Sequence, residues 1–459
     1  MKLGIVSLIE QYQITEMFSN GMLSTHPCGK THLMQPRGPH SVGYIDVMTP
    51  GTPETGSFMR LYYPTDQQCL AEHDRWPIWA SEEKYISGIF TFMRSMIYRW
   101  PSWAPRSEFL FYNKVQHFVK LVPYYGFTKA FRYLFGHVYV PIIENASIKD
   151  PDSGKKWPVV VFSHGIGCSR TMYSQVCYDM ASYGMIVAAT EHREGSACMS
   201  CYYSSKPDNE ANDINWVEHY KCELSEDEYA LRNRQVHLRS KEASRTLDVL
   251  IGLNNGESLQ NVFKKHKAIE SNETDSSNLS SFKDKLDISK PIMSGHSFGG
   301  ATTLLALAED SRFNIGIALD AWLYPIKELN LAETVQQPIL FINTESFLNT
   351  RNLNKMATFQ SSKSQNIDRK SFYIRGTVHQ NHLDLPFLVP QTTVKKVLGL
   401  HSKTSPELAM NVNNKLMVQF IYKHTGVPSD SELDEEIMKN SSILREGFEI
   451  SDNVPTTDW

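Results

Sequence analysis

The sequence predicts an α/β fold in which a mostly parallel central sheet has helices on both faces and an antiparallel hairpin at its N-terminal edge. Short, continuous apolar runs, typical of strands buried on both faces, alternate with helical stretches along the chain. One of these runs leads into the turn motif Gly-His-Ser-Phe-Gly at residues 295–299, and a helical stretch of small residues follows it. Two β-prone runs near the N-terminus, separated by a turn-rich segment, indicate the hairpin.

Composition limits the classes of protein that need to be considered. The chain has 459 residues, of which 41% are hydrophobic and 11% aromatic, and this is ample for a large core. A net charge of -4 gives no indication of a nucleic-acid-binding surface. No apolar stretch is long enough to form a transmembrane segment. The seven cysteines, in a chain without a recognisable secretory leader, favour reduced thiols and a cytosolic location.

Regular elements can be assigned from apolar periodicity and capping signals. Pro158 introduces a buried strand, and a helix then leads to a second buried strand, which makes a β-α-β unit. Residues 225–228 resemble a capping box that opens a long helix to about Leu250. The predicted strands are Ser41–Val47, Ser57–Tyr63, Val159–Phe162, Met185–Thr190, Ile315–Leu319, Ile339–Asn343 and Ser371–Ile374, and the predicted helices include Tyr173–Tyr183 and Leu408–His424.

Several stretches are predicted from composition rather than periodicity. The charged residues of the long helix are expected to form a solvated face; they are Arg232, Arg234, Arg239, Lys241 and Glu242. The Ser- and Asn-rich residues 271–281 indicate a flexible insertion, which we place at 254–286. We expect residues 1–40 to be irregular, residues 41–428 to form the α/β domain, and residues 429–459 to form an acidic, loosely packed tail.

Residues 76–137 are unusually rich in tryptophan and phenylalanine. Between Lys114 and Leu134, apolar residues alternate with basic ones. One interpretation is a helical layer that packs on the sheet with its lysines in water. The other is an amphipathic surface that rests on lipid headgroups. Composition by itself favours the first interpretation.

The motif at residues 295–299 predicts a nucleophile elbow, the strand-turn-helix structure in which a serine is held in a strained conformation and exposed. The alternative is an ordinary Gly-rich turn. An apolar strand before the motif and a small-residue helix after it favour the elbow. Glycine is needed at both ends of the motif because a side chain there would collide with the neighbouring strand and helix. Ser297 is therefore the candidate nucleophile, and the fold is expected to be of the α/β-hydrolase type.

A serine hydroxyl needs a general base, and in this fold the order along the chain is serine, acid, histidine. His379 lies directly in the loop after the last predicted strand, and we prefer it to His382 as the base. Asp320 and Glu345 each follow a predicted strand, and either could orient the imidazole. Asp320 is favoured because it ends a wholly apolar strand, where an unpaired carboxylate would be unfavourable. Both acids could instead be helix caps.

The expected chemistry is two-step acyl transfer through an acyl-enzyme. Residues 163–167, Ser-His-Gly-Ile-Gly, follow an early strand, where this fold takes one oxyanion donor; the alternative is a simple strand-to-helix turn. The backbone N–H groups of Ile166 and Phe298 would then bind the oxyanion. No motif calls for a metal or another cofactor. A hydrolase-fold binding module without activity is the competing class, although such proteins usually lack one of the three reactive side chains.

With these residues considered, the chain resembles the platelet-activating factor acetylhydrolase family, the calcium-independent, lipoprotein-associated type of phospholipase A2. The similarity extends in order over roughly residues 40–425. The segments that carry it are residues 163–167 (SHGIG), 187–193 (VAATEHR), 232–236 (RNRQV), 295–302 (GHSFGGAT), 317–322 (IALDAW) and 375–381 (RGTVHQN).

The resemblance implies a serine esterase that hydrolyses the sn-2 acetyl, or short or oxidised acyl, group of glycerophospholipids at a membrane or lipoprotein surface. It favours the lipid-surface interpretation for residues 114–135 and 392–400. It also implies a cytoplasmic, peripherally membrane-associated protein, or a secreted one if the true N-terminus differs. A general carboxylesterase acting on neutral esters is the alternative enzyme. The residues implied are Ser297, Asp320 and His379 as the triad, Ile166 and Phe298 as oxyanion donors, and Trp322 and Gln380 near the acyl pocket.

Overall fold

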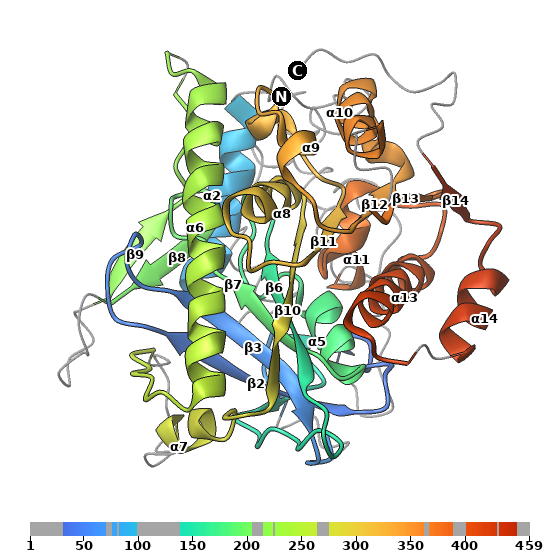
Figure 1. The fold of residues 1–459 in the computed structure, drawn as a ribbon. Coiled ribbons are helices and arrows are strands. Elements are labelled where there is room, and N and C mark those ends of the chain that lie inside the picture. Colours follow the sequence, from blue (N-terminus) through green and yellow to red (C-terminus); the bar gives the residue numbers. More distant parts are fainter. Residues whose placement is uncertain are drawn as a thin grey trace, which may run out of the picture.

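The computed structural model describes most of the chain between residues 31 and 447. The described ranges are 31–69, 76–79, 82–98, 138–203, 214–223, 225–263, 275–361, 367–388, 401–428 and 431–447. Within them, a ten-stranded sheet has the order β14-β13-β12-β11-β10-β6-β7-β3-β2-β5 (Figure 1). Its strands are β2 (Ser41–Met48), β3 (Phe58–Thr65), β5 (Ile143–Glu144), β6 (Trp157–Ser163), β7 (Ile186–Thr190), β10 (Leu286–His296), β11 (Ile315–Leu319), β12 (Ile339–Thr344), β13 (Arg369–Ile374) and β14 (Leu444–Glu446).

The six neighbouring strands β7, β6, β10, β11, β12 and β13 are parallel, so their carboxyl ends lie along one edge of the sheet. The predicted hairpin forms as β2 and β3, and β3 pairs antiparallel with β7. The hairpin does not form the edge of the sheet, however, because β5 pairs parallel with the outer side of β2. Two small sheets pair β1 (Thr31–His32) with β4 (Val138–Tyr139), and β8 (Met199–Tyr202) with β9 (Asn215–Glu218).

Helices cover both faces of the sheet, as predicted. Alternate residues of β6 explain this, because Val160 and Phe162 belong to one core and Val159 and Val161 to the other. The first core contains residues of α2 (Glu83–Tyr98), α5 (Ser174–Ser182) and α13 (Pro406–Thr425). The second contains residues of α6 (Glu228–Asn255), α8 (Phe298–Glu309), α9 (Leu331–Thr334) and α10 (Thr350–Ser361) (Figure 1).

Three expectations about α6 and its surroundings were wrong in whole or in part. The helix begins at Glu228, and its N-cap is Asp227, whose carboxylate accepts the Tyr229 N–H, so the predicted capping box does not form. The supposed solvated face is only partly in water: Arg232, Arg239 and Glu242 are buried, whereas Arg234 and Lys241 are exposed as expected. Described residues of the predicted flexible insertion form a helix and pack against the core. They include α7 (Asp275–Ser280), and the side chains of Leu279 and Phe282 are buried in the second core.

The C-terminal segment also differs from the predicted loose tail. Helix α14 (Ser431–Lys439) follows α13, and β14 pairs antiparallel with β13 at the edge of the sheet. This happens because Leu433 and Ile437 supply apolar side chains that pack on the first core. Residues 448–459 lie outside the described residues.

Much of the aromatic-rich segment lies outside the described residues, as do both stretches expected at a lipid surface, 114–135 and 392–400. Where the segment is described, Trp76 and Trp79 are buried. None of the described helices is both long and apolar enough to cross a membrane.

The elbow forms where β10, α8 and β6 meet. A Cβ atom added at Gly299 would lie 2.0 Å from the Ser163 carbonyl oxygen, and one at Gly295 would lie 2.4 Å from the Gly299 carbonyl oxygen. Both distances are far below van der Waals contact, so the backbones can approach this closely only without side chains. The predicted role of the two glycines is confirmed.

The substitution Gly299→Ala should therefore destabilise the fold strongly. Its Cβ would meet backbone of β6, which cannot move aside cheaply, and we expect a loss of about 3 kcal/mol or more in the unfolding free energy measured in urea. The control is Gly252→Ala in α6, where the new Cβ meets the flexible end of Glu257 at 3.1 Å. That variant should be as stable as wild type or gain up to about 1 kcal/mol. Equal stability of the two variants would contradict the idea that the close approach of Gly299 to β6 requires glycine.

Candidate active site

Ser297 lies in the turn between β10 and α8 with φ 57° and ψ -114°, a strained conformation for a residue other than glycine. Its backbone is fixed on both sides. The Ser297 N–H donates to the Leu319 carbonyl at 2.9 Å, and its carbonyl accepts the Trp322 N–H at 2.9 Å. The residue is 5% exposed, so it is buried and not exposed as expected. The elbow predicted from the sequence is thus present, and the strand that ends at Leu319 holds it from the side.

Asp320 directly follows that strand and is also in a strained conformation, with φ 41°. It is fully buried, and its carboxylate accepts hydrogen bonds from the Thr344 N–H (2.6 Å) and the Thr344 hydroxyl (2.5 Å). One of its oxygens, Oδ2, lies 3.0 Å from His379 Nδ1. The buried carboxylate is therefore fully partnered and holds the imidazole in a defined orientation.

His379 opens the short helix η6 (His379–His382) after β13. Its ring stacks on the Phe347 ring with centroids 3.8 Å apart, and its side chain is 17% exposed. With Nδ1 directed at Asp320, Nε2 is the nitrogen left to exchange a proton. No hydrogen bond joins His379 to the Ser297 hydroxyl in the described part of the chain. The ring of His296, the residue before the serine, lies 4.3 Å from the His379 ring. Catalytic hydrogen bonds in unliganded enzymes are often long and shorten on substrate binding.

The structure distinguishes the other candidates by their surroundings. Glu345 is exposed and accepts the Gly376 N–H at 2.8 Å, so it is Asp320 that pairs with His379. His382 is buried, with Nε2 3.7 Å from Asp320 Oδ2. Burial lowers the pKa of His382 to about 4, so its ring is neutral and inaccessible to a substrate.

The loop at residues 163–167 lies against the elbow. A Cβ added at Gly165 would be 3.3 Å from Ser297 Cβ. The N–H groups of Ile166 and Phe298, the predicted donor pair, do not donate to any described acceptor. Unoccupied N–H groups beside a serine are what an oxyanion site requires. Phe298 is also the first residue of α8, whose N-terminus favours negative charge.

The two residues expected near the acyl pocket occupy different surroundings. Trp322 is 1% exposed, and its ring packs edge-on against Phe298 with centroids 5.3 Å apart. Gln380 is half-buried within η6, and its carbonyl accepts the Leu383 N–H at 3.0 Å. Trp322 thus supports the elbow through its backbone and ring. Whether either residue contacts an acyl group stays a prediction.

Sequence reasoning missed three residues that hold the site. Thr344 anchors Asp320, as described above. The Tyr173 hydroxyl accepts the Gly165 N–H (3.0 Å) and lies 2.8 Å from His296 Nδ1. Asp384 docks the His379 loop onto α5 by accepting the N–H groups of Ser174 (2.9 Å) and Gln175 (3.0 Å). Of these three residues, only Thr344 could have been suspected from the sequence, because it ends the predicted strand beside Asp320.

Three potential metal-ligand side chains, His296, Asp320 and His379, lie together at the site. Three of their ligand-capable atoms, Asp320 Oδ2, His379 Nδ1 and His296 Nδ1, already have hydrogen-bond partners, however. Asp320 Oδ2 receives hydrogen bonds from Thr344 and His379, and His296 Nδ1 is within hydrogen-bonding distance of Tyr173. The donor set therefore fits a hydrogen-bonded proton relay better than a metal site.

Acid should destabilise the protein partly through His382. Its pKa is about 4 in the folded state and near 6.5 in the unfolded chain, so the unfolded chain binds a proton that the folded chain excludes. The unfolding free energy therefore falls as the pH drops from about 6.5 to 4, and this residue accounts for about 3 kcal/mol of that loss. We expect His382→Gln to reduce the slope of the unfolding free energy against pH by the equivalent of about one bound proton, measured in urea between about pH 4 and 6.5. An unchanged slope would refute the burial argument.

Comparisons with known proteins identify the family and the fold. The family profile described as platelet-activating factor acetylhydrolase, isoform II, matches residues 26–100 and 97–442. The platelet-activating factor acetylhydrolase of Gallus gallus is 33% identical over 425 residues, 91% of this chain and 88% of the relative. That of Cavia porcellus is 31% identical over 429 residues, 94% and 85% of the two chains. A ferulic acid esterase from Streptomyces cinnamoneus shares the α/β-hydrolase fold, with a TM-score of 0.54 at 17% identity, covering 91% of this chain and 99% of the esterase. This chain belongs to the platelet-activating factor acetylhydrolase family.

Proposed function

We propose that this protein is a serine esterase that hydrolyses the sn-2 acetyl, or another short or oxidised acyl, ester of platelet-activating factor and related glycerophospholipids. The observation that carries the proposal is the buried Asp320 carboxylate, which holds His379 at 3.0 Å beside the elbow of Ser297. Family membership supplies the substrate class, because the relatives carry the name of this activity. Family membership and geometry thus support the same reaction.

In the proposed mechanism, Ser297 Oγ attacks the sn-2 carbonyl carbon while His379 Nε2 takes the hydroxyl proton. The carbonyl oxygen becomes an oxyanion that accepts hydrogen bonds from the Ile166 and Phe298 N–H groups. When the tetrahedral intermediate collapses, the ester C–O bond breaks and His379 returns the proton to the lysophospholipid oxygen. A water molecule then attacks the acyl-enzyme with His379 again as base, which releases the short acid and restores Ser297.

Asp320 has two functions in this scheme. By accepting the Nδ1–H of His379, it fixes the tautomer in which Nε2 can act as a base. It also stabilises the imidazolium that forms as the proton moves. The two hydrogen bonds from Thr344 hold the carboxylate in place while this happens.

The proposed substrates partition into lipid phases, so we propose that the protein acts at a membrane or lipoprotein surface as a peripheral protein. A cytoplasmic location is part of the proposal and rests on the sequence. The proposal includes independence from calcium, because every charge in the scheme is stabilised by residues of the chain.

A chain-length series tests the substrate class. Acetyl and short-chain sn-2 phosphatidylcholines should be hydrolysed with a kcat/KM at least about 100-fold above that of palmitoyl, since the tail would have to enter the site with the ester. Activity should be the same with and without a calcium chelator. Ser297→Ala should lose both hydrolysis and labelling by a fluorophosphonate probe, whereas Ser289→Ala, an exposed serine earlier in β10, should keep them. Equal cleavage of long chains would point to a general lipase, and a wild type that does not label would point to a binding module.

The pairing of His379 with Asp320 can be tested with two isosteric substitutions. Asp320→Asn should lower kcat by about 10³- to 10⁴-fold, because the amide cannot hold the Nδ1–H tautomer. Glu345→Gln is the matched control, and it should change kcat by less than about threefold, since its partner is the Gly376 N–H. A large loss in Glu345→Gln and a small one in Asp320→Asn would reverse the assignment of the acid.

A further inference from the structure

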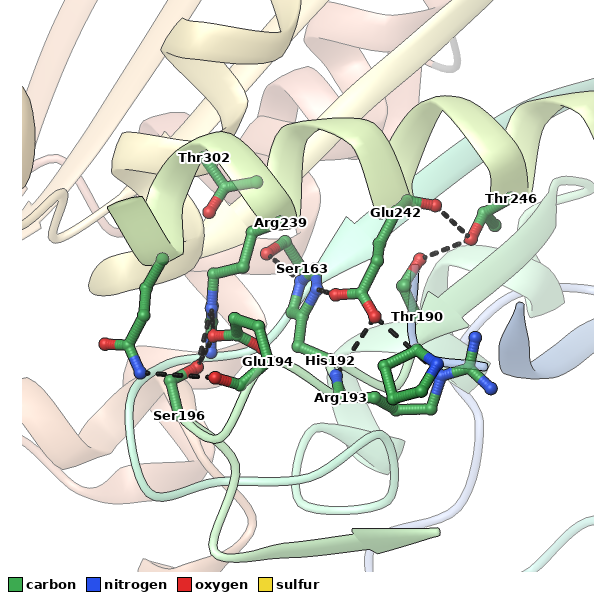
Figure 2. Close-up of polar contacts among 12 residues, drawn as sticks. Ser163, Thr190, His192, Arg193, Glu194, Ser196, Arg239, Glu242, Thr246 and Thr302 are labelled. Carbon is green, nitrogen blue, oxygen red and sulfur yellow. Dashed lines mark hydrogen bonds and ion pairs between the residues drawn. The ribbon is translucent and has the colours of Figure 1, made fainter. Parts of the chain in front are cut away.

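A second serine–histidine–carboxylate chain lies behind the first, wholly inside the protein (Figure 2). Ser163 Oγ is 2.7 Å from His192 Nε2, and His192 Nδ1 is 2.8 Å from Glu242 Oε2. The geometry is that of a triad, yet the three residues are at most 3% exposed. Burial lowers the pKa of His192 well below its ordinary value and raises that of Glu242 to about 7. No substrate can reach this chain, so its role must be exerted on its neighbours.

The neighbour on one side is His164, in the loop that carries the Ile166 donor. Burial keeps the pKa of His164 far below its ordinary value, so the ring is neutral and has one N–H. Its Nε2 accepts the backbone N–H of His192 at 3.1 Å, so the proton must be on Nδ1. Nδ1 then donates to the Gly165 carbonyl at 2.8 Å. The buried network therefore selects one tautomer of His164.

These contacts fix two successive peptide groups of the loop. In the first, the His164 carbonyl accepts from Arg239 Nη1 at 2.6 Å, and the Gly165 N–H donates to Tyr173 at 3.0 Å. In the second, the Gly165 carbonyl accepts from His164 Nδ1 and from the Cys168 N–H (3.3 Å). In a trans peptide the N–H points opposite to the C=O. The Ile166 N–H is therefore held pointing away from these partners.

Arg239 also contacts the residue that carries the other donor. Its guanidinium carbon lies 4.4 Å from the centroid of the Phe298 ring, a cation–π contact. The side chain is 0% exposed, and Nε is held by Glu194 Oε1 (3.0 Å) and Ser196 Oγ (2.8 Å), as Figure 2 shows. The buried guanidinium of Arg239 thus contacts both the loop that carries Ile166, through the His164 carbonyl, and the ring of Phe298.

We infer that Arg239 is a positioning residue that presets the two oxyanion donors, by holding the His164 carbonyl with its Nη1 and the Phe298 ring with its cationic face. The inference deepens the proposed function and rests on it. Because the donors stabilise charge that develops in the transition state, misplacing them lowers kcat and leaves KM nearly unchanged. Loss of one donor typically lowers kcat about 10²- to 10³-fold, which sets the upper limit for an effect through position.

The test variant is Arg239→Lys, which keeps the positive charge beside Glu194 but cannot bond Glu194, Ser196 and the His164 carbonyl at once. The matched control is Arg60→Lys. Arg60 is another buried arginine, bonded to Asp46 by Nε (2.9 Å) and Nη2 (2.7 Å), and it lies on β3 away from the elbow. Both variants should lose thermal stability to a similar degree. We expect kcat on a short-chain ester to fall at least about 30-fold in Arg239→Lys and less than about threefold in Arg60→Lys.

A pair of inhibitors separates positioning from general damage. A trifluoromethyl ketone analogue of the substrate adds to the serine and places an oxyanion on the two N–H groups, whereas an sn-2 ether analogue binds without reacting. In Arg239→Lys, affinity for the ketone should fall in proportion to kcat/KM, and affinity for the ether should stay within about threefold of wild type. Equal losses for the ketone and the ether, or a kcat like that of Arg60→Lys, would overturn the inference.

If Arg239→Lys does not fold, Tyr173→Phe tests the same peptide group, because Tyr173 holds the Gly165 N–H while Arg239 holds the His164 carbonyl. This substitution removes the hydroxyl that accepts the Gly165 N–H and keeps the ring, and we expect kcat to fall at least about 10-fold with the same ketone-to-ether pattern. Unchanged kcat in a folded Tyr173→Phe would overturn the inference. A wild type that neither hydrolyses the ester nor labels at Ser297 would instead refute the proposed function, so the two failures are distinguishable.

Discussion

The active site depends on one steric constraint, the approach of the Gly299 backbone to the carbonyl of Ser163. The position that a Cβ would occupy at Gly299 is 2.0 Å from that oxygen. This contact places α8 directly over the end of β6, so Ser297, the proposed nucleophile, and the loop after β6 come together. Once the two are in contact, the strained turn at Ser297 is held by hydrogen bonds to Leu319, at the end of β11, and to Trp322, just beyond it. Strain of this kind persists only where the surroundings over-determine the conformation.

Burial assigns different roles to chemically identical side chains. His164, His192, His296 and His382 are buried, and desolvation lowers the pKa of each, so their rings are neutral. His379 is partly exposed and has a carboxylate partner, which are the conditions for a base that must meet a substrate. The same reasoning separates Asp320, buried and paired with this imidazole, from the exposed Glu345. The chemistry of the site thus follows from solvent exposure and hydrogen-bond partners together.

Helix α6 shows how a structural element can serve a site that it does not enter. It lies along the second core, and its inward residues Arg239 and Glu242 reach the loop and strand ends beneath the elbow (Figure 1, Figure 2). Buried charges of this kind are unfavourable unless they are paired and hydrogen-bonded. Here Arg239 is bonded to Glu194, and Glu242 accepts from His192 and from the Arg193 N–H. The network can therefore be rigid, which is what an electrostatically preorganised site requires.

The sequence by itself determined the strands of the parallel sheet and the elbow at Ser297, because these are encoded in local apolar runs and in glycines that the turn requires. It could not determine that Arg239 and Glu242 face inward, since a charged residue in a helix is solvated unless distant segments bring it partners. It favoured Asp320 over Glu345 because of the apolar strand before it, but it could not show which of the two carboxylates contacts His379, since both follow strands. Only the tertiary structure decided these points, because burial and pairing depend on residues far apart in the chain, such as Thr344 beside Asp320 and Glu194 beside Arg239.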